Sequence, residues 1–260
     1  MKPAGTRQVD LNCDMGELPD AIADGSQEAL MPWLTSVNVA CGGHAGDEET
    51  MKATIEQALR WKLAIGAHPG YPDRPNFGRV ELKLSAQEIA QFVFEQVQAL
   101  AEVAAKCGGC IVHVKPHGAL YNQAAHDREL AAAFAGGVAR WNRDVVLVGL
   151  AGAPMLDVFQ EAGFAVAAEA FADRRYRPDG TLRSRKLDDA LICDPDEASR
   201  QALSIVERGT VIASDGSELA VNAQTLCIHG DNPGAVRIAK AVALTLRQAG
   251  VTLSAFSRQR

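Results

Sequence analysis

Seven short apolar runs, separated by helical or loop segments, constrain the fold of this chain more than any other feature. Their β-branched and small apolar residues are typical of strands that are buried on both faces. Strands that alternate with helices pair in parallel through right-handed crossovers. The predicted strands cover residues 9–13, 36–41, 63–67, 111–115, 145–150, 164–169 and 225–228.

Capping residues and helical spacing predict six helices around these strands. Asp47 is a suitable N-cap for a helix over 48–61, and Ser85 with Glu88 forms a capping box before a helix that stops at Gly108. No linker or break in composition divides the chain, so we expect one α/β domain over residues 1–260. The remaining predicted elements are helices at 128–141, 154–162, 195–208 and 233–248, and a small hairpin around 211–221.

Polar side chains gather where the predicted strands end. In an open sheet, functional groups concentrate at one crevice, whereas the loops of a closed barrel all converge on one face. Because these groups come from strands along the whole chain, we predict a barrel of about seven strands with its site at their carboxyl ends. The groups are Asn12, Asp14, Asn38, His44, His68, Lys115, His117, Glu169, Asp173, Arg174, His229 and Asp231.

Two other histidines fall outside this set. His113 alternates with its apolar neighbours on a strand, so we expect it to face the opposite side of that strand from them. His126 is expected in a polar loop without a functional role.

These residue types can supply general acids and bases, or can bind a metal. Lys115 and Arg174 add positive charge that suits a carboxylate or a phosphate. The chain has no H-E-x-x-H motif, so only the expected convergence of these side chains at one face indicates a metal. The identity of that metal stays unknown. It also lacks a P-loop, a G-x-G-x-x-G fingerprint and a G-x-S-x-G elbow, which argues against those nucleotide sites and against a serine hydrolase.

The composition of the chain limits the kinds of binding partner that are expected. The formal net charge is −6 and aromatic residues make up 5%, so neither nucleic acid nor a membrane surface is expected as a partner. The first eight residues are short and polar and predict no signal peptide. We therefore expect a cytoplasmic protein with six free cysteines, and a structural role for the Cys107-x-x-Cys110 pair.

The motifs together resemble the LamB/YcsF family, in order, from about residue 8 to 250. The runs that carry the resemblance are DLNCDMGE (10–17), NVACGGHAGD (38–47), GAHPGYPD (66–73), FGR (77–79), VKPHGALYN (114–122), EAFADR (169–174), the segment 176–182, and IHGDNPGA (228–235).

This resemblance implies a fold and an activity. The implied fold is a distorted (β/α)7-type barrel related to the glycoside hydrolase/deacetylase barrels. The implied activity is that of the A subunit of a 5-oxoprolinase, which acts with subunits B and C and opens 5-oxo-L-proline (pyroglutamate) to L-glutamate. ATP, with Mg²⁺, would be the co-substrate.

Roles for individual residues follow as hypotheses from this chemistry. Lys115 and Arg174 would bind anionic groups, while Asp14 with His68 or His117 would move protons. The predicted catalytic residues are Asp14, His68, Lys115 and His117. The predicted substrate- or phosphate-binding residues are Asn12, Asn38, His44, Arg79, Glu169, Arg174, His229 and Asp231.

Two segments depart from the family pattern, and two other functions stay open. Gly43 replaces an expected aromatic residue, which predicts a wider mouth beside His44, and the stretch 183–193 is unusual. One alternative is a metal-dependent, deacetylase-like hydrolase that acts alone. The other is a subunit that binds a small acid without catalysis.

Overall fold

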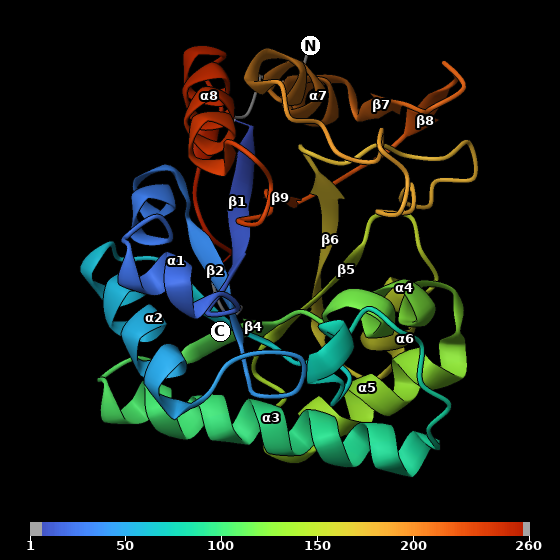
Figure 1. Cartoon of the computed structure of the whole chain (residues 1–260). Helices are drawn as coiled ribbons and strands as arrows, with labels where there is room; N and C mark the ends of the chain where they lie inside the picture. The colour runs from blue at the N-terminus through green and yellow to red at the C-terminus, as the bar shows by residue number, and fades with distance from the viewer. Residues whose placement is uncertain (1–6, 257–260) are drawn as a thin grey trace.

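A closed barrel of seven parallel strands forms the centre of the computed structural model, which describes residues 7–256. Each strand pairs with the next along the chain, and closure comes from the last strand, which pairs with both the sixth and the first. Helices surround the barrel (Figure 1). The barrel strands are β1 (Gln8–Met15), β2 (Ser36–Ala40), β3 (Ala64–His68), β4 (Ile111–Val114), β5 (Val146–Leu150), β6 (Ala165–Phe171) and β9 (Thr225–Cys227).

All seven predicted strands are therefore present, and the predicted barrel is confirmed. The clearest shift in bounds is at β1, which continues through Asp14 to Met15 instead of ending at Cys13. Asp14 consequently lies within the strand, level with Asn38 of β2. A further short strand, β10 (Thr252–Leu253), pairs in parallel with the start of β1 and was not predicted.

The predicted helices also form, with the predicted caps. The Asp47 side chain accepts a hydrogen bond from the Thr50 amide, and Ser85 with Glu88 makes a complete capping box. No helix within residues 7–256 is both long and apolar enough to cross a bilayer. The helices are α2 (Glu48–Arg60), α3 (Ala86–Lys106), α5 (Arg128–Trp141), α6 (Met155–Glu161), α7 (Pro195–Arg208) and α8 (Ala235–Gln248), and the hairpin consists of β7 (Thr210–Ile212) and β8 (Glu218–Ala220).

Several short helices were not predicted. The most important is α4 (Gly118–His126), which places His126 at a helix end and corrects its expected position in a loop. The helix begins at Gly118, whose φ of 56° falls in the left-handed region. A glycine in that conformation is typical of a turn, and for this reason the sequence did not predict a helix here. The others are α1 (Pro19–Ala23) and the 3₁₀ turns η1 (Glu28–Trp33) and η2 (Arg74–Asn76).

The barrel interior is polar on one side. Alternate residues of a strand share a face, and the buried Asp10 and Asn12 of β1 form such a series with the half-buried Asp14. Asp10 accepts hydrogen bonds from Ser36 and Thr225, at 2.9 and 2.5 Å. This polar series leads from the base of the barrel towards its carboxyl end.

A small apolar cluster fills another part of the interior. It comprises Val146 and Val148 of β5 with Ala167 of β6, and Phe256 packs against it from the end of the described chain. The Phe256 ring also meets the His113 ring edge-on, with centroids 4.9 Å apart. His113 is fully buried and belongs to the same interior.

Candidate functional site

A cavity of about 660 Å³ opens at the carboxyl ends of the strands. Eight of the predicted site residues line it: Asp14, His68, Arg79, Lys115, His117, Arg174, His229 and Asp231. The other four, Asn12, Asn38, His44 and Glu169, are buried next to these residues and are not part of the cavity wall. The structure therefore brings all twelve predicted residues together: eight line the cavity and four lie buried behind them.

Lys115 is the central cation of the cavity floor. Its Nζ lies 2.9 Å from both Asp14 Oδ1 and Glu169 Oε1, and 3.3 Å from Cys227 Sγ. Burial by itself would lower the pKa of Lys115, but the charges of Asp14, Cys227 and Glu169 raise it well above its usual value. Lys115 is accordingly a charged ammonium held by two carboxylates.

Asp14 carries the complementary charge. Burial opposes its ionisation, yet the neighbouring His68 and the ammonium of Lys115 hold the pKa of this carboxyl well below its usual value. Burial raises the pKa of the neighbouring Cys227 thiol well above normal, so that this sulfur stays protonated. The floor of the cavity thus combines a carboxylate base and an ammonium, and a neutral thiol is buried behind them.

Two buried amides support this floor from below. Asn38 Nδ2 donates to Asp14 Oδ1 at 2.8 Å and to Asn12 Oδ1 at 2.7 Å, while Asn12 Nδ2 donates to Glu169 Oε1 at 3.1 Å. His113 Nε2 lies 2.7 Å from Asn38 Oδ1 and must donate to that oxygen. Burial lowers the pKa of His113 to about 3, so its ring is neutral.

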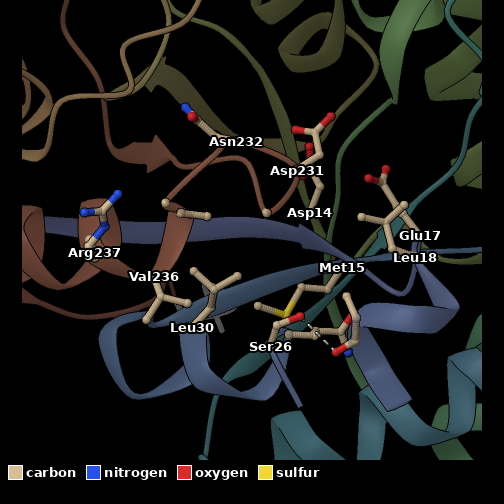
Figure 2. A pocket seen from close by; sticks show the side chains of 15 residues that line it. Asp14, Met15, Glu17, Leu18, Ser26, Leu30, Asp231, Asn232, Val236 and Arg237 are labelled. Atoms are coloured by element: carbon tan, nitrogen blue, oxygen red, sulfur yellow. Dashed lines mark hydrogen bonds between the residues drawn. The ribbon is translucent and has the colours of Figure 1, made fainter. Parts of the chain in front are cut away.

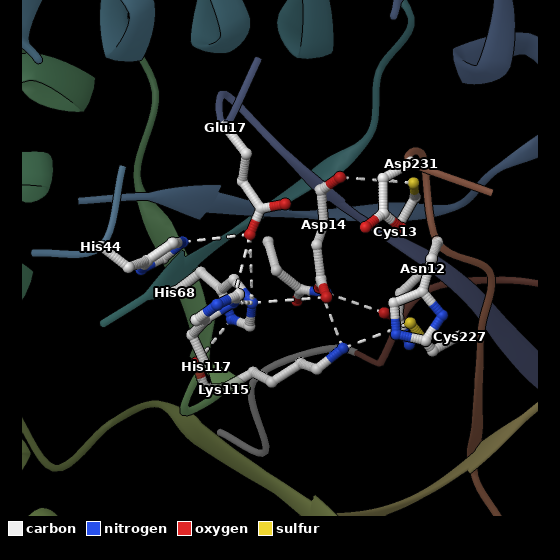
Figure 3. A network of polar contacts seen from close by, with 12 residues as sticks. Asn12, Cys13, Asp14, Glu17, His44, His68, Lys115, His117, Cys227 and Asp231 are labelled. Carbon is white, nitrogen blue, oxygen red and sulfur yellow. Dashed lines mark hydrogen bonds and ion pairs between the residues drawn. The ribbon is translucent and has the colours of Figure 1, made fainter. Parts of the chain in front are cut away.

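Glu17 joins three histidines at the other side of the floor and was missing from the predicted site (Figure 3). Its Oε1 lies 3.0 Å from His44 Nε2, 3.2 Å from His117 Nδ1 and 3.9 Å from His68 Nε2. The contact with His117 Nδ1 and the hydrogen bond from His44 Nε2 outweigh burial and lower the pKa of Glu17. Gly16, with a φ of 75°, makes the turn after β1 that brings Glu17 back to the mouth.

The three imidazoles pack closely together. The rings of His44 and His117 stack with centroids 3.6 Å apart and planes 3° from parallel. Burial lowers the pKa of His44 to about 4, so this ring is neutral at physiological pH. His44 thus supports Glu17 and His117 from behind and does not face the cavity.

Arginine side chains form the rim. Arg79 Nη2 and Arg185 Nη1 both contact Asp231 Oδ2, at 2.7 and 2.8 Å. Arg174 donates from Nη2 to the Arg183 carbonyl at 2.7 Å, while its buried Nε has no hydrogen-bond partner. Burial and the nearby Arg185 lower the pKa of Arg174 to about 10, so it remains charged. This cationic rim suits a carboxylate or phosphate ligand.

The unusual stretch 183–193 contributes to that rim. It belongs to the long connection between β6 and α7, which folds over the mouth through bridges that join Arg174 to Leu191 and Tyr176 to Leu182. Arg183, Arg185 and Lys186 from this stretch line the cavity. None of them was a predicted site residue.

Asp173 fixes His229 at the far wall. The carboxylate accepts hydrogen bonds from His229 Nδ1 and from the His229 amide, both at 2.9 Å, and from Asn232 Nδ2 at 3.1 Å. Despite burial, these interactions lower the pKa of Asp173. Because Nδ1 donates to Asp173, the Nε2 atom of His229 is the ring nitrogen left for a ligand.

A second, smaller pocket lies on the other side of Asp14 and Glu17 (Figure 2). Its volume is about 260 Å³, and apolar side chains such as Leu18, Leu30 and Val236 line much of it. It runs between the segment after β1 and the start of α8.

The predicted widening of the mouth at Gly43 is wrong. A Cβ atom at this position would lie 2.4 Å from Gln96 Oε1 and 2.6 Å from the Gly70 carbonyl oxygen. The Gln96 side chain fills the space, where it donates to the Gly70 carbonyl and accepts from the Gly70 amide. The absent side chain is thus replaced by packing from α3.

Two groups of side chains are close enough to share a metal ion. One comprises Asp14, Cys227 and His229, and the other comprises Glu17, His68 and His117. These are the groups found within residues 7–256, and neither includes the Cys107-x-x-Cys110 pair.

Comparisons with known proteins agree along nearly the whole chain. The model of the LamB/YcsF family matches residues 9–260. A protein of Chloroflexus aggregans, named as the A subunit of 5-oxoprolinase, is 48% identical over 245 residues, which are 94% of this chain and 97% of that protein. The crystal structure of a lactam utilization protein from Thermus thermophilus has 42% identity and a TM-score of 0.88, and covers 96% of this chain and 100% of that chain.

A more distant likeness concerns the fold alone. The Xyl-CE4 domain of a multidomain xylanase from the hindgut metagenome of Trinervitermes trinervoides is 11% identical, with a TM-score of 0.50. The comparison covers 96% of this chain and 87% of that chain. The barrel is thus of the deacetylase-like type, as predicted.

Proposed function

This chain belongs to the LamB/YcsF family, and from this premise we propose that it is the A subunit of a 5-oxoprolinase and contains the ring-opening site. Its relatives of 46–48% identity carry that name. The observation that carries the proposal is the charged Lys115, buried between Asp14 and Glu169 at the floor of an arginine-rimmed cavity. Such a floor suits a small, anionic, amide-containing substrate.

The proposed substrate makes specific chemical demands. A five-membered lactam is a resonance-stabilised amide, and its nitrogen is a poor leaving group. Phosphorylation of the ring carbonyl oxygen gives an imidate that water can attack. The site must then bind anions, activate water and return a proton to the ring nitrogen when the C–N bond breaks. This cleavage leaves an acyl phosphate, which a second water hydrolyses to glutamate and inorganic phosphate.

The cavity residues match these demands. In the proposal, the arginine rim formed by Arg79, Arg174 and Arg185 binds the substrate carboxylate or the phosphoryl group. Lys115 binds the negative charge of the phosphoryl group on the former carbonyl oxygen, because a preorganised buried cation is most effective at such a position. Asp14 accepts a proton from water, and His68 or His117 passes a proton to the ring nitrogen.

ATP and the partner subunits complete the proposal. We propose that ATP, with Mg²⁺, is a co-substrate of an assembled enzyme that also contains subunits B and C. The relatives' printed name describes a subunit, which supports a larger assembly. Because ATP is a cytoplasmic metabolite, the proposed reaction belongs to that compartment.

An add-back experiment tests the proposal. Subunits B and C are incubated with 5-oxoproline and ATP, and glutamate is measured with this chain omitted and then restored. We expect glutamate release only when the chain is present. Equal release in both samples would disprove the assigned role.

The Glu17, His68 and His117 group favours a second candidate, a metal-dependent hydrolase that acts alone on an amide or an acylated sugar. This activity would need neither ATP nor partner subunits. Hydrolysis of such a substrate by the isolated chain, abolished by a chelator and indifferent to ATP, would favour the second candidate over the first.

A further inference from the structure

The hydrogen bonds around His68 and His117 determine which ring nitrogens face the cavity. His68 Nδ1 lies 2.8 Å from the Lys115 carbonyl oxygen, and His117 Nε2 lies 2.9 Å from the Phe77 carbonyl oxygen. A carbonyl oxygen only accepts, so both of these nitrogens carry hydrogen. In the neutral rings, His68 Nε2 and His117 Nδ1 are therefore unprotonated acceptors.

These two acceptors point at each other and at two carboxylates (Figure 3). The two nitrogens are 3.0 Å apart. Glu17 Oε1 is 3.2 Å from His117 Nδ1 and 3.9 Å from His68 Nε2, and Asp14 Oδ2 is 3.3 Å from His68 Nε2. Four electron-rich atoms thus converge with no hydrogen between them.

A single added proton does not resolve this arrangement. A proton on His68 Nε2 leaves His117 Nδ1 facing Glu17 without a hydrogen, and a proton on His117 Nδ1 leaves His68 Nε2 facing Asp14 without one. Two protons would place two imidazolium rings 4.9 Å apart in a buried site beside the Lys115 ammonium. Like charges at that separation oppose each other strongly in a site that is largely buried.

We infer that Glu17, His68 and His117 bind a divalent transition-metal ion such as Zn²⁺. Atoms about 2.1 Å from a metal lie about 3.0 Å apart at right angles and about 3.4 Å apart at tetrahedral angles. Two of the three ligand separations, 3.0 and 3.2 Å, match this range, and the third, 3.9 Å, needs a small contraction. Two imidazoles and one carboxylate form a common metal-binding set that leaves positions open to water.

The surroundings of the ligands support this inference. Metal-bound histidines usually donate their other ring N–H to a carbonyl or carboxylate, as His68 and His117 both do here. All three ligands line the large cavity, so the ion would be accessible to substrate and water. Asp14 lies beside it and would accept a proton from such a water. With the ion bound, Asp14 would also pass this proton to the ring nitrogen in place of His68 or His117, because both imidazoles would be metal ligands.

The other cluster, Asp14 with Cys227 and His229, does not call for a metal. Lys115 already places a positive charge between Asp14 and Cys227. The inferred ion therefore belongs to the Glu17 side of the cavity.

Titration of the metal-free chain with Zn²⁺ by isothermal calorimetry tests the inference. We expect one ion per chain, with affinity weakened on the order of 100-fold or more in Glu17→Gln and His117→Gln. The control is the double variant Cys107→Ser/Cys110→Ser, which should bind as tightly as the original chain. Unchanged binding in both ligand variants, or loss of binding in the cysteine control, would overturn the inference.

Co²⁺ supplies a readout that needs no variant. Bound to the unaltered chain, Co²⁺ should show the visible absorption of nitrogen and oxygen ligands without a thiolate charge-transfer band. A thiolate band, or no binding, would contradict the assignment. The role of the ion in ring opening rests on the proposed function. Glutamate release that persists when this chain is fully depleted of metal would refute that role but leave the proposed function intact.

Discussion

Lys115 illustrates, at the scale of a single residue, why sequence reasoning found much of the site. A lysine directly after an apolar strand has no structural role in a hydrophobic core, and it is buried here between Asp14 and Glu169. Glu17 escaped prediction because it lies beyond the β1 apolar run and reaches the mouth only through the turn at Gly16. The sequence does show the Glu17 carboxylate, in the DMGE run. The residue types alone do not show in which direction this side chain points.

Replacement of Lys115 by Met tests the buried ion pairs. Met is similar in length but uncharged, so Asp14 and Glu169 would lose the cation that they share in a largely buried site. We expect the free energy of unfolding at pH 7 to fall by about 3–5 kcal/mol, the usual cost of breaking a buried pair. Denaturant unfolding measures it.

Lys52→Met is the matched control. Lys52 forms an exposed pair with Glu56 one helical turn away, and should change stability by less than about 1 kcal/mol. A similar, small effect of both substitutions would show that burial of Lys115 does not have the predicted consequence.

At the scale of the elements, contacts between helices set which glycines are replaceable. Gly136 and Gly137 are neighbours in α5, but a Cβ at Gly137 would lie 2.6 Å from the Ala90 carbonyl oxygen and 2.8 Å from Val93 Cβ in α3. A Cβ at Gly136 meets nothing within 4 Å. The close approach of α3 to α5 thus depends on Gly137 and not on Gly136.

Alanine substitutions at these two positions should have opposite effects. Gly136→Ala should stabilise the protein by about 0.5–1 kcal/mol, because alanine is the better helix former. Gly137→Ala should destabilise it by roughly 1–3 kcal/mol, because backbone must move to admit the methyl group. Thermal or denaturant unfolding of both variants decides the matter, and effects of the same sign would contradict the described packing.

The strands and long helices were predictable because their signals are local. The helices are predicted from their capping residues, such as Asp47 and Ser85, and both helices and strands are predicted from the periodicity of their apolar residues. The connection between β6 and α7 was not predictable, because its path depends on long-range bridges such as that of Tyr176 with Ala213. Arg185 was therefore missed, since only those bridges bring it to Asp231.

At the scale of the whole molecule, the barrel interior links stability to pH. The pKa of Asp10 is raised to about 6, because burial outweighs the hydrogen bonds from Thr225, Thr35 and Ser36. The folded protein therefore binds a proton that the unfolded chain releases near pH 4. It follows that this group's contribution to stability is complete at low pH and is lost as pH rises through about 6.

Asp10→Asn removes that titration. Between pH 4 and pH 7, the free energy of unfolding of the variant should rise relative to the unaltered protein, by up to about 3 kcal/mol for a shift of this size. Any constant cost of the new amide cancels in this comparison of slopes. Parallel stability profiles over the same pH range would show that Asp10 titrates normally.

The central claim is that the mouth of this barrel opens the lactam, and Asp14→Asn tests it most directly. Asparagine keeps the size of the side chain and removes the carboxylate that would accept the proton from water. In a complex reassembled with subunits B and C, with folding verified by circular dichroism, kcat for glutamate release from 5-oxoproline is measured. We expect kcat to fall about 100-fold or more. Glutamate release at the original rate would contradict the proposed role of the barrel mouth.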